Sequence, residues 1–187
     1  MRSQTSDVIL QYASPCKTVS FSRSEDGAKA MVPQAFYGDV VAHLASTLQD
    51  VVGLSDAEGF VATVGTRMGR DISDAYQPKE QASHHHIAKI LVDLKRRIGG
   101  TFKVDSITPD QIILSNGRCP FGDRVKGRPA LCMMTTNVFG TVVSDRNGYA
   151  HVDVTDSIAE NGSFCRVVVT LNAADIDVAT GTEFFAD

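Results

Sequence analysis

The feature that most constrains this chain is a change of hydrophobic period at the pair Gly99-Gly100. Before the pair, apolar residues recur every three or four positions, which is the spacing of one face of an α-helix. After it, short β-favouring runs are separated by turn residues. Helices that precede the strands, rather than alternate with them, are typical of an α+β domain. We therefore predict N-terminal helices packed on a small antiparallel sheet, with one short helix inserted among the strands.

Three helices are expected before the glycine pair, over residues 33–53, 55–74 and 83–98. Ser55 and Glu58 have the spacing of a capping box, which would start the second helix. That helix contains glycines, each of which lowers helix propensity by roughly 1 kcal/mol relative to alanine. Such a cost is usually tolerated where another backbone comes close. We therefore expect tight packing against a neighbour at Gly59, Gly65 and Gly69.

The strands are expected in two pairs. Residues 101–107 and 111–115 flank a Thr-Pro-Asp turn and predict a hairpin. Residues 149–154 and 164–171 predict two further strands, joined through an Asn-Gly turn. The inserted helix opens at Pro129, because proline suits the first turn of a helix.

Length and charge limit the kind of protein. A chain of 187 residues favours one domain, so we interpret residues 1–33 as a lead-in segment and residues 34–187 as a single domain. The formal net charge is -4, and no cluster of basic residues supplies the positive field that nucleic acids require. No run approaches the roughly 18 apolar residues of a membrane span, and no signal peptide is recognisable. We predict a cytoplasmic protein that binds neither nucleic acid directly nor membranes.

Three cysteines lie near the ends of predicted elements. Cys119 is in a loop, Cys132 is in the first turn of the inserted helix, and Cys165 begins the last strand. The helix dipole is expected to lower the pKa of the Cys132 thiol. Soft thiolates at such positions suit an iron-sulfur cluster or zinc, with Cys16 as the candidate fourth ligand. The residues equally support the opposing interpretation, in which the cysteines are small buried hydrophobes and hold no cofactor.

An apolar pocket is the second candidate site. Met and Phe side chains fill irregular cavities adaptably, and five of them could line a pocket beside Cys132: Phe121, Met133, Met134, Phe139 and Phe164. Ordinary core packing explains the same residues. We interpret the basic residues late in the third helix as a solvated face: Lys95, Arg96 and Arg97. No nucleophile elbow, phosphate-binding loop or carboxylate pair is present, so we predict that the chain is not an enzyme.

The second half of the chain resembles the methanogen output domain family, whose members are regulatory modules. The resemblance is carried by CPFG at 119–122, PALCMMT at 129–135, NVFG at 137–140, GYA at 148–150 and GSFC at 162–165. The preceding helices resemble, more loosely, the vinyl-reductase-like sensor domains related to the TRAPP trafficking subunits. The segment between Cys119 and Cys132 is also similar to the effector half of winged-helix repressors that sense an iron-sulfur cluster. That similarity implies Cys119, Cys132 and Cys165 as cluster ligands, although this chain has no winged-helix domain.

Together these observations predict a sensory or regulatory domain without catalytic activity. Its redox-responsive metal centre would be an iron-sulfur cluster, with zinc as the alternative metal, and it would signal to a partner protein. A homodimer is the candidate assembly. The first alternative is a small-molecule sensor in which the second and third helices and the sheet enclose an apolar pocket and the cysteines are structural. The second is a redox enzyme that cycles a thiol at Cys132.

Overall fold

The computed structural model describes residues 21–23, 29–77, 82–173 and 180–186. The helices of this part are α1 (Pro33–Val52), α2 (Leu54–Ala75), α3 (His84–Arg97) and α4 (Met133–Asn147). The main sheet contains β3 (Phe102–Ile107), β4 (Gln111–Asn116), β5 (Tyr149–Asp156), β6 (Cys165–Thr170) and β7 (Thr182–Phe185). Short 3-10 turns are η1 (Gly122–Val125), η2 (Pro129–Cys132) and η3 (Ile158–Glu160). In the lead-in segment, β1 (Phe21–Arg23) pairs with β2 (Lys29–Met31).

The main sheet is antiparallel, with the strand order β3-β4-β6-β5-β7. Both predicted strand pairs are confirmed, since β3 pairs with β4 and β5 pairs with β6. The edge strand β7 was not predicted from the sequence. It has four residues, too few to display a period, and it is held by register with a distant segment, in which Tyr149 faces Phe185.

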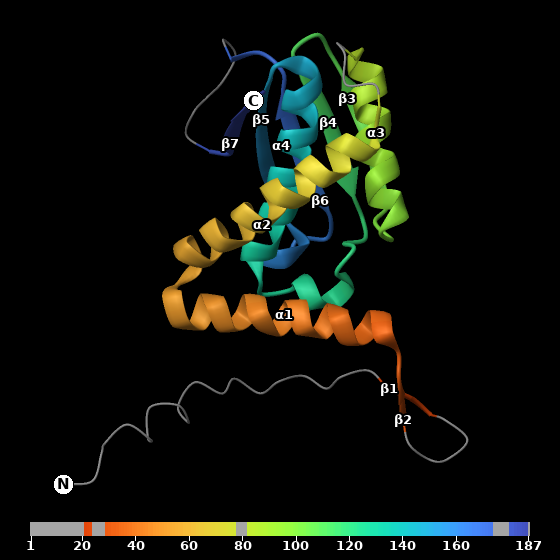
Figure 1. Ribbon diagram of the computed structural model, residues 1–187, viewed down its shortest axis with the longest axis vertical. Helices are drawn as coiled ribbons and strands as arrows, with labels where there is room; N and C mark the ends of the chain where they lie inside the picture. The colour runs from red at the N-terminus through yellow and green to blue at the C-terminus, as the bar shows by residue number, and fades with distance from the viewer. Residues whose placement is uncertain (1–20, 24–28, 78–81, 174–179, 187) are drawn as a thin grey trace, which may run out of the picture.

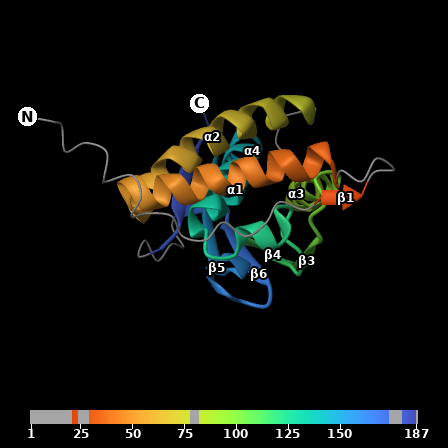
Figure 2. The same ribbon diagram turned by 90° about the horizontal axis from the view of Figure 1, so that it is seen from below.

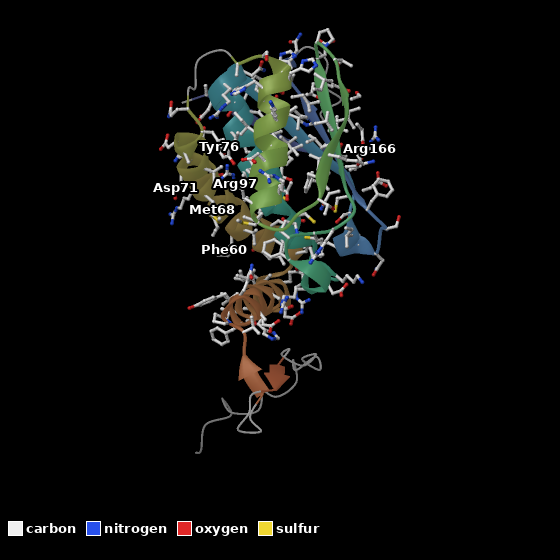
Figure 3. All side chains as sticks on the ribbon, turned by 90° about the vertical axis from the view of Figure 1, so that its right-hand side faces the viewer. Phe60, Met68, Asp71, Tyr76, Arg97 and Arg166 are labelled. Carbon is white, nitrogen blue, oxygen red and sulfur yellow. The ribbon has the colours of Figure 1, made fainter. Side chains whose placement is uncertain are left out.

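The elements form layers, as Figure 1 shows. Helices α3 and α4 cover one face of the sheet, α2 crosses the outer side of α4, and α1 lies across one end of the stack (Figures 1 and 2). The side chain of Arg166, on β6, points away from the helices on the opposite face (Figure 3). The α+β class and the packing of helices on an antiparallel sheet are therefore as predicted.

Helix α4 is the centre of the fold. It begins at Met133, after Pro129 has opened η2 rather than the α-helix itself. Ten of its 15 residues are buried, because the sheet covers one side and α2 the other. The main core joins Phe139 and Val142 of α4 with Leu91 of α3 and the inner face of the strands. The inserted helix, expected to be short, is the middle layer of the molecule.

Two glycines allow α2 to lie close against α4. A Cβ atom added at Gly65 would lie 2.8 Å from Cβ of Asn137, and one added at Gly69 would lie 2.8 Å from Cβ of Thr141. Both distances are shorter than real Cβ contacts. The predicted tight packing is confirmed at these two positions. It is wrong at Gly59, where an added Cβ would meet nothing within 4 Å.

This difference supplies a matched pair of substitutions. Gly65→Ala is expected to lower the free energy of unfolding by about 1–2 kcal/mol, because overpacking of the α2–α4 contact outweighs the gain in helix propensity. Gly59→Ala places the same methyl group on the exposed side of the same helix and is expected to raise it by up to about 1 kcal/mol. Urea titration of both variants measures the two changes. Equal effects at the two positions would contradict the close packing.

The start of α2 differs from the sequence prediction. The helix begins at Leu54, with Gly53 as the N-cap residue and no side chain capping it. Gly53 has a φ of 85°, a conformation that favours glycine, and it is at once the end of α1 and the start of α2. The capping box of Ser55 and Glu58 is therefore wrong. The single-residue connection leaves no room for a separate cap.

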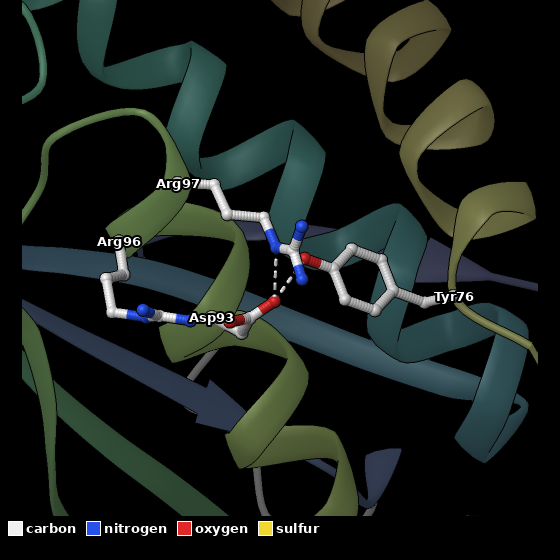
Figure 4. A network of polar contacts seen from close by, with 4 residues as sticks. All are labelled: Tyr76, Asp93, Arg96 and Arg97. Atoms are coloured by element: carbon white, nitrogen blue, oxygen red, sulfur yellow. Dashed lines mark hydrogen bonds and ion pairs between the residues drawn. The ribbon is translucent and has the colours of Figure 1, made fainter.

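A polar cluster joins the end of α2 to α3 (Figure 4). The hydroxyl of Tyr76 donates to Oδ2 of Asp93 over 2.8 Å, and the guanidinium groups of Arg96 and Arg97 each donate to the same carboxylate over 2.6 Å. These hydrogen bonds, first from Arg97, hold the pKa of the Asp93 carboxyl well below its usual range. The two arginines are otherwise solvated, as predicted for this face.

Candidate functional site

A cavity of about 670 Å³ opens between the helices and one end of the sheet. Its walls come from α1, α2, the last turns of α3, the ends of β4 and β6, and the segment from Cys119 to Thr135. Almost all of the lining is apolar. The lining includes Val64 of α2 and five polar or sulfur-containing side chains: Lys95, Asn116, Cys119, Cys132 and Cys165. Its volume falls within the range of about 300–1,000 Å³ that is typical of small-molecule sites.

The apolar stripes of α1 and α2 are turned toward this cavity or toward the surface. On α2, Phe60 is 57% exposed and Val64 is 50% exposed, and both line the cavity. In Figure 3, Phe60 and Met68 lie on α2, on the side near the C-terminal end of α3. The residues of α2 that are truly buried are small, such as Gly65 and Gly69, because they are the ones that contact α4.

The three predicted cysteines meet at this cavity. Cys165 is the register partner of Asn116 where β6 and β4 pair, so their side chains share one face of the sheet. Cys119 follows β4 directly, and Cys132 is the N-cap residue of α4. All three line the cavity, although they are 13 and 33 residues apart in the chain.

Burial governs the ionisation of these thiols. It raises the pKa of Cys132 to about 11, against a weaker opposing hydrogen bond from Ser157, whose Oγ lies 3.2 Å from the sulfur. Burial likewise raises the pKa of Cys119 and Cys165. The predicted lowering of the Cys132 pKa is therefore wrong. The residue does stand at a helix start, but removal from water outweighs the helix dipole there.

The metal prediction has a partial counterpart in the structure. Among the residues that the structure describes, no group of three or more His, Cys, Asp or Glu side chains could hold a metal ion. The three thiols line one cavity without forming such a group. The candidate fourth ligand, Cys16, lies outside the described residues.

The five residues predicted to line a pocket are divided by the structure. Phe121 and Met134 line the cavity. Phe139 is fully buried in the main core, and Met133 packs in a small cluster between α2 and η2. Phe164 is 41% exposed and does not line the cavity. A pocket is therefore present near Cys132, but most of its wall comes from other residues, many of them on α1 and α2.

Lys95 was missed by sequence reasoning. It was interpreted as part of a solvated face, yet its side chain is only 4% exposed and lines the cavity. Its Nζ donates to Oγ1 of Thr135 over 2.8 Å and lies 5.5 Å and 5.1 Å from the ring centres of Phe102 and Phe139. Burial lowers the pKa of Lys95 to about 8. The signal in the sequence is spacing, because Lys95 follows Ile87 and Leu91 at intervals of four on the buried face of α3.

Asn116 is the second buried polar group of the cavity, with an exposed fraction of 1%. Its Oδ1 accepts hydrogen bonds from the backbone N–H groups of Thr101, at 3.0 Å, and Arg118, at 3.3 Å. Backbone N–H groups can only donate, so these bonds fix which end of the amide is oxygen. Nδ2 has no hydrogen-bond partner among the described residues. Unsatisfied buried donors are rare in native proteins and call for an explanation.

Two arginines tie α1 to the segment that carries the cysteines. Arg128 donates from Nε to the backbone oxygen of Ala42 and to Oγ of Ser46, at 3.0 and 2.6 Å. Arg124 forms an ion pair with Asp39, and its guanidinium lowers the pKa of that carboxyl. The wall of the cavity formed by α1 is thereby fixed to the wall formed by residues 119–135.

Fold and site define a class: a helical half packed on an antiparallel sheet, with an apolar cavity where the two meet. Within that class, the family model of methanogen output domain 1 matches residues 40–170. The chain therefore belongs to the methanogen output domain 1 family, as the resemblance in its second half predicted. A comparison with curated proteins finds no match.

One solved structure supports the fold, and a second is reported beside it. The phenol-responsive sensory domain of the transcription activator PoxR, in complex with phenol, is 16% identical and has a TM-score of 0.54. The match covers 71% of this chain and 73% of that domain. A mutant of the Fe(II) unliganded H-NOX protein from K. algicida is 14% identical, with a TM-score of 0.47 and coverage of 80% of each chain. No helix in the described part of the chain is long and apolar enough to cross a membrane.

Proposed function

We propose that this chain is a small-molecule sensory domain whose ligand binds in the cavity between α1, α2 and the end of the sheet. The observation that supports the proposal is the cavity itself, which is of ligand size. Large apolar side chains such as Phe60 and Val64 line it and stay exposed instead of packing in the core. Helices normally bury such stripes, because exposed apolar area costs about 25 cal/mol per Å². A ligand that fills the cavity would recover part of this free energy.

The family and the fold agree with a sensory role. An output domain is a regulatory module, and the PoxR domain of similar fold is described as phenol-responsive. Signalling to a partner protein is part of the proposal, and a cytoplasmic location and a homodimer stay predictions. Because Arg124 and Arg128 join α1 to the cavity wall, we propose that ligand occupancy is reported through the position of α1.

Thermal unfolding in the presence of apolar small molecules tests the proposal. A panel of phenol and straight-chain alcohols is expected to raise the melting temperature, because a ligand that binds only the folded state stabilises it. Val64→Trp, which fills the cavity from α2, is expected to abolish this increase. The matched control is Val51→Trp, on a residue of α1 that is 76% exposed and outside the cavity, and it should leave the increase intact.

The same experiment separates this function from the metal centre. Replacing Cys119, Cys132 and Cys165 together with serine should preserve the ligand-dependent stabilisation if the cysteines are structural. If no compound of the panel stabilises the wild-type protein, or if both tryptophan variants behave alike, the cavity is not the ligand site.

An iron-sulfur cluster is the second candidate, because three thiols line one cavity. Here Cys119, Cys132 and Cys165 would hold the cluster, which would supply redox sensitivity, and their side chains would have to close around it. Anaerobic purification followed by iron and sulfide analysis tests this candidate. Iron and sulfide retained by the wild type and lost from the Cys132→Ser variant would support the cluster. Their absence after reconstitution would remove it.

The structure gives little support to a redox enzyme at Cys132. A catalytic cysteine reacts as the thiolate, and burial raises the pKa of this thiol to about 11. Cys132 should therefore be alkylated no faster than Cys119 or Cys165 at neutral pH, which mass spectrometry of iodoacetamide-treated protein can measure.

A further inference from the structure

We propose that the ligand of this cavity is an apolar carboxylic acid, whose carboxylate accepts hydrogen bonds from Nζ of Lys95 and Nδ2 of Asn116. The inference rests on the small-molecule function proposed above and names the chemical class of the ligand. It assigns a binding role to two buried polar side chains in an otherwise apolar wall.

Lys95 and Asn116 have more hydrogen-bond donors than the described residues satisfy. An ammonium group has three N–H donors and no acceptor, and only Thr135 accepts from Lys95 among the described residues. The amide of Asn116 adds Nδ2, which has no partner there. The thiols that share the cavity are weak donors and are kept protonated by burial. A ligand oxygen that only accepts would satisfy both residues at once.

Lys95 and Asn116 both lie beside Phe102. Nζ of Lys95 lies over the ring of Phe102, 5.5 Å from its centre. Phe102 is the register partner of Asn116 between β3 and β4, so the two side chains stand side by side on the inner face of the sheet. Lys95 and Asn116 therefore approach the same end of the cavity from α3 and from β4. A carboxylate has two oxygens that only accept, so it can face both donors at once.

Lys95 brings a buried positive charge into the cavity wall. No carboxylate of the described residues forms an ion pair with Lys95, although a buried cation normally has a partner. The ionisable side chains that share the cavity with Lys95 are those of Cys119, Cys132 and Cys165. A neutral thiol does not supply the missing negative charge. A bound anion would supply it, while the rest of the ligand contacts apolar helix residues such as Val64 and Met68.

A series of ligands with one hydrocarbon body and three head groups tests the inference. Calorimetry would compare decanoate, decanol and decylammonium on the wild-type protein. Decanoate is expected to bind about 10- to 100-fold more tightly than decanol, because hydrogen bonds to a charged group stabilise a complex more than neutral hydrogen bonds do. Decylammonium should bind most weakly, since its charge repels Lys95.

Variants assign the preference to the two residues. Lys95→Met should bring decanoate to the affinity of decanol and leave decanol within about threefold of its wild-type value. Asn116→Asp keeps an oxygen for Thr101 and Arg118 but removes the donor, so it should weaken decanoate at least tenfold and strengthen decylammonium. Lys89→Met, on the exposed side of α3, is the control and should change none of the three affinities.

The outcomes separate the two proposals. If the wild type binds decanol as tightly as decanoate, the carboxylate inference is overturned and the small-molecule function stands. If Lys95→Met and Asn116→Asp retain the preference for decanoate, these residues do not make it. If none of the three compounds binds, the proposed function fails together with the inference.

Discussion

Replacing Arg146 with Met is expected to lower the free energy of unfolding by about 3 kcal/mol. Arg146 is a buried residue of α4 whose guanidinium reaches the C-terminal end of α2. It donates to Oγ of Ser73 at 2.7 Å and to the backbone oxygens of Ser73, at 3.1 Å, and Tyr76. Methionine fills the same space without a donor, so the Tyr76 carbonyl would be left unsatisfied at a cost of about 1–3 kcal/mol, while the Ser73 carbonyl would keep only its bond from the Tyr76 N–H and Ser73 Oγ would lose a donor.

The position of this guanidinium explains the size of the effect. The last turn of α2 contains no basic residue of its own, and its free carbonyl groups carry the negative end of the helix dipole. Arg146 provides the positive charge from a neighbouring helix. Asp145 extends the network by accepting from Oγ of Ser73 over 2.6 Å. Loss of Arg146 would therefore loosen the end of α2 and the cavity wall that α2 forms.

Two variants make this prediction specific. Arg146→Lys retains the charge but not the planar fork of donors, and it should recover only part of the loss. Arg118→Met changes an exposed arginine and should stay within about 0.5 kcal/mol of the wild type. The measurement is urea unfolding of the three variants beside the wild type. A loss at Arg146→Met no larger than that at Arg118→Met would contradict the capping role.

Sequence periodicity predicted the elements well because helices and strands are local. The boundaries of α1, α3, β4 and the β5–β6 pair follow from repeats of apolar residues and from turn residues within a few positions of each end. Proline at 33 and glycine at 53 bound α1, and the side chain of Ser83 caps α3 by accepting from the backbone of His86. These signals need no knowledge of distant contacts.

The direction in which α2 faces could not be obtained in this way. The stripe containing Phe60 and Val64 has the same spacing as a core stripe, but the core face of α2 is the row of small residues around Gly65. Close approach to α4 selects the small row, and the large side chains are left to line a cavity. A period shows that a face is apolar. Whether it meets protein or an open cavity depends on the partner helix.

The cysteine motifs and the site chemistry show the same division. The sequence placed Cys119, Cys132 and Cys165 at element ends, and the fold brings them to one cavity. Their ionisation could not be inferred, because burial depends on residues far away in the chain. Lys95 was interpreted as solvated, since lysine is rarely buried, although its spacing on α3 matched the buried face. A charged residue at a buried position of an apolar helix face, such as Lys95, is the signal of a functional position.

The second large effect is expected from the same lysine. Lys95→Met should raise the free energy of unfolding at pH 7 by about 2 kcal/mol. Burial lowers the pKa of Lys95 from 10.5 to about 8, so the protonated side chain is held in the folded state at a cost of about 3 kcal/mol. Methionine avoids that cost and keeps the apolar contacts with Phe102 and Phe139, and it loses only the hydrogen bond to Thr135. Lys89→Met on the exposed side of α3 should stay within about 0.5 kcal/mol of the wild type.

The pH dependence of this gain has a defined sign. Between pH 8 and pH 10.5 the unfolded chain still holds the lysine proton that the folded protein has released, so this group adds stability as the pH rises through that window. The advantage of Lys95→Met over the wild type should therefore be largest below pH 8 and shrink toward pH 10. The raised pKa values of Cys119, Cys132 and Cys165 act in the opposite direction at high pH, and burial, their main cause, is common to both proteins. Loss of the Lys95 charge removes an interaction that lowers the pKa of Cys119 and Cys165, which further shrinks the advantage of Lys95→Met at high pH. Urea unfolding of the pair from pH 6 to pH 10 measures this difference. A gain that is absent at pH 7 or grows with pH would contradict a buried ammonium that has no carboxylate partner among the described residues.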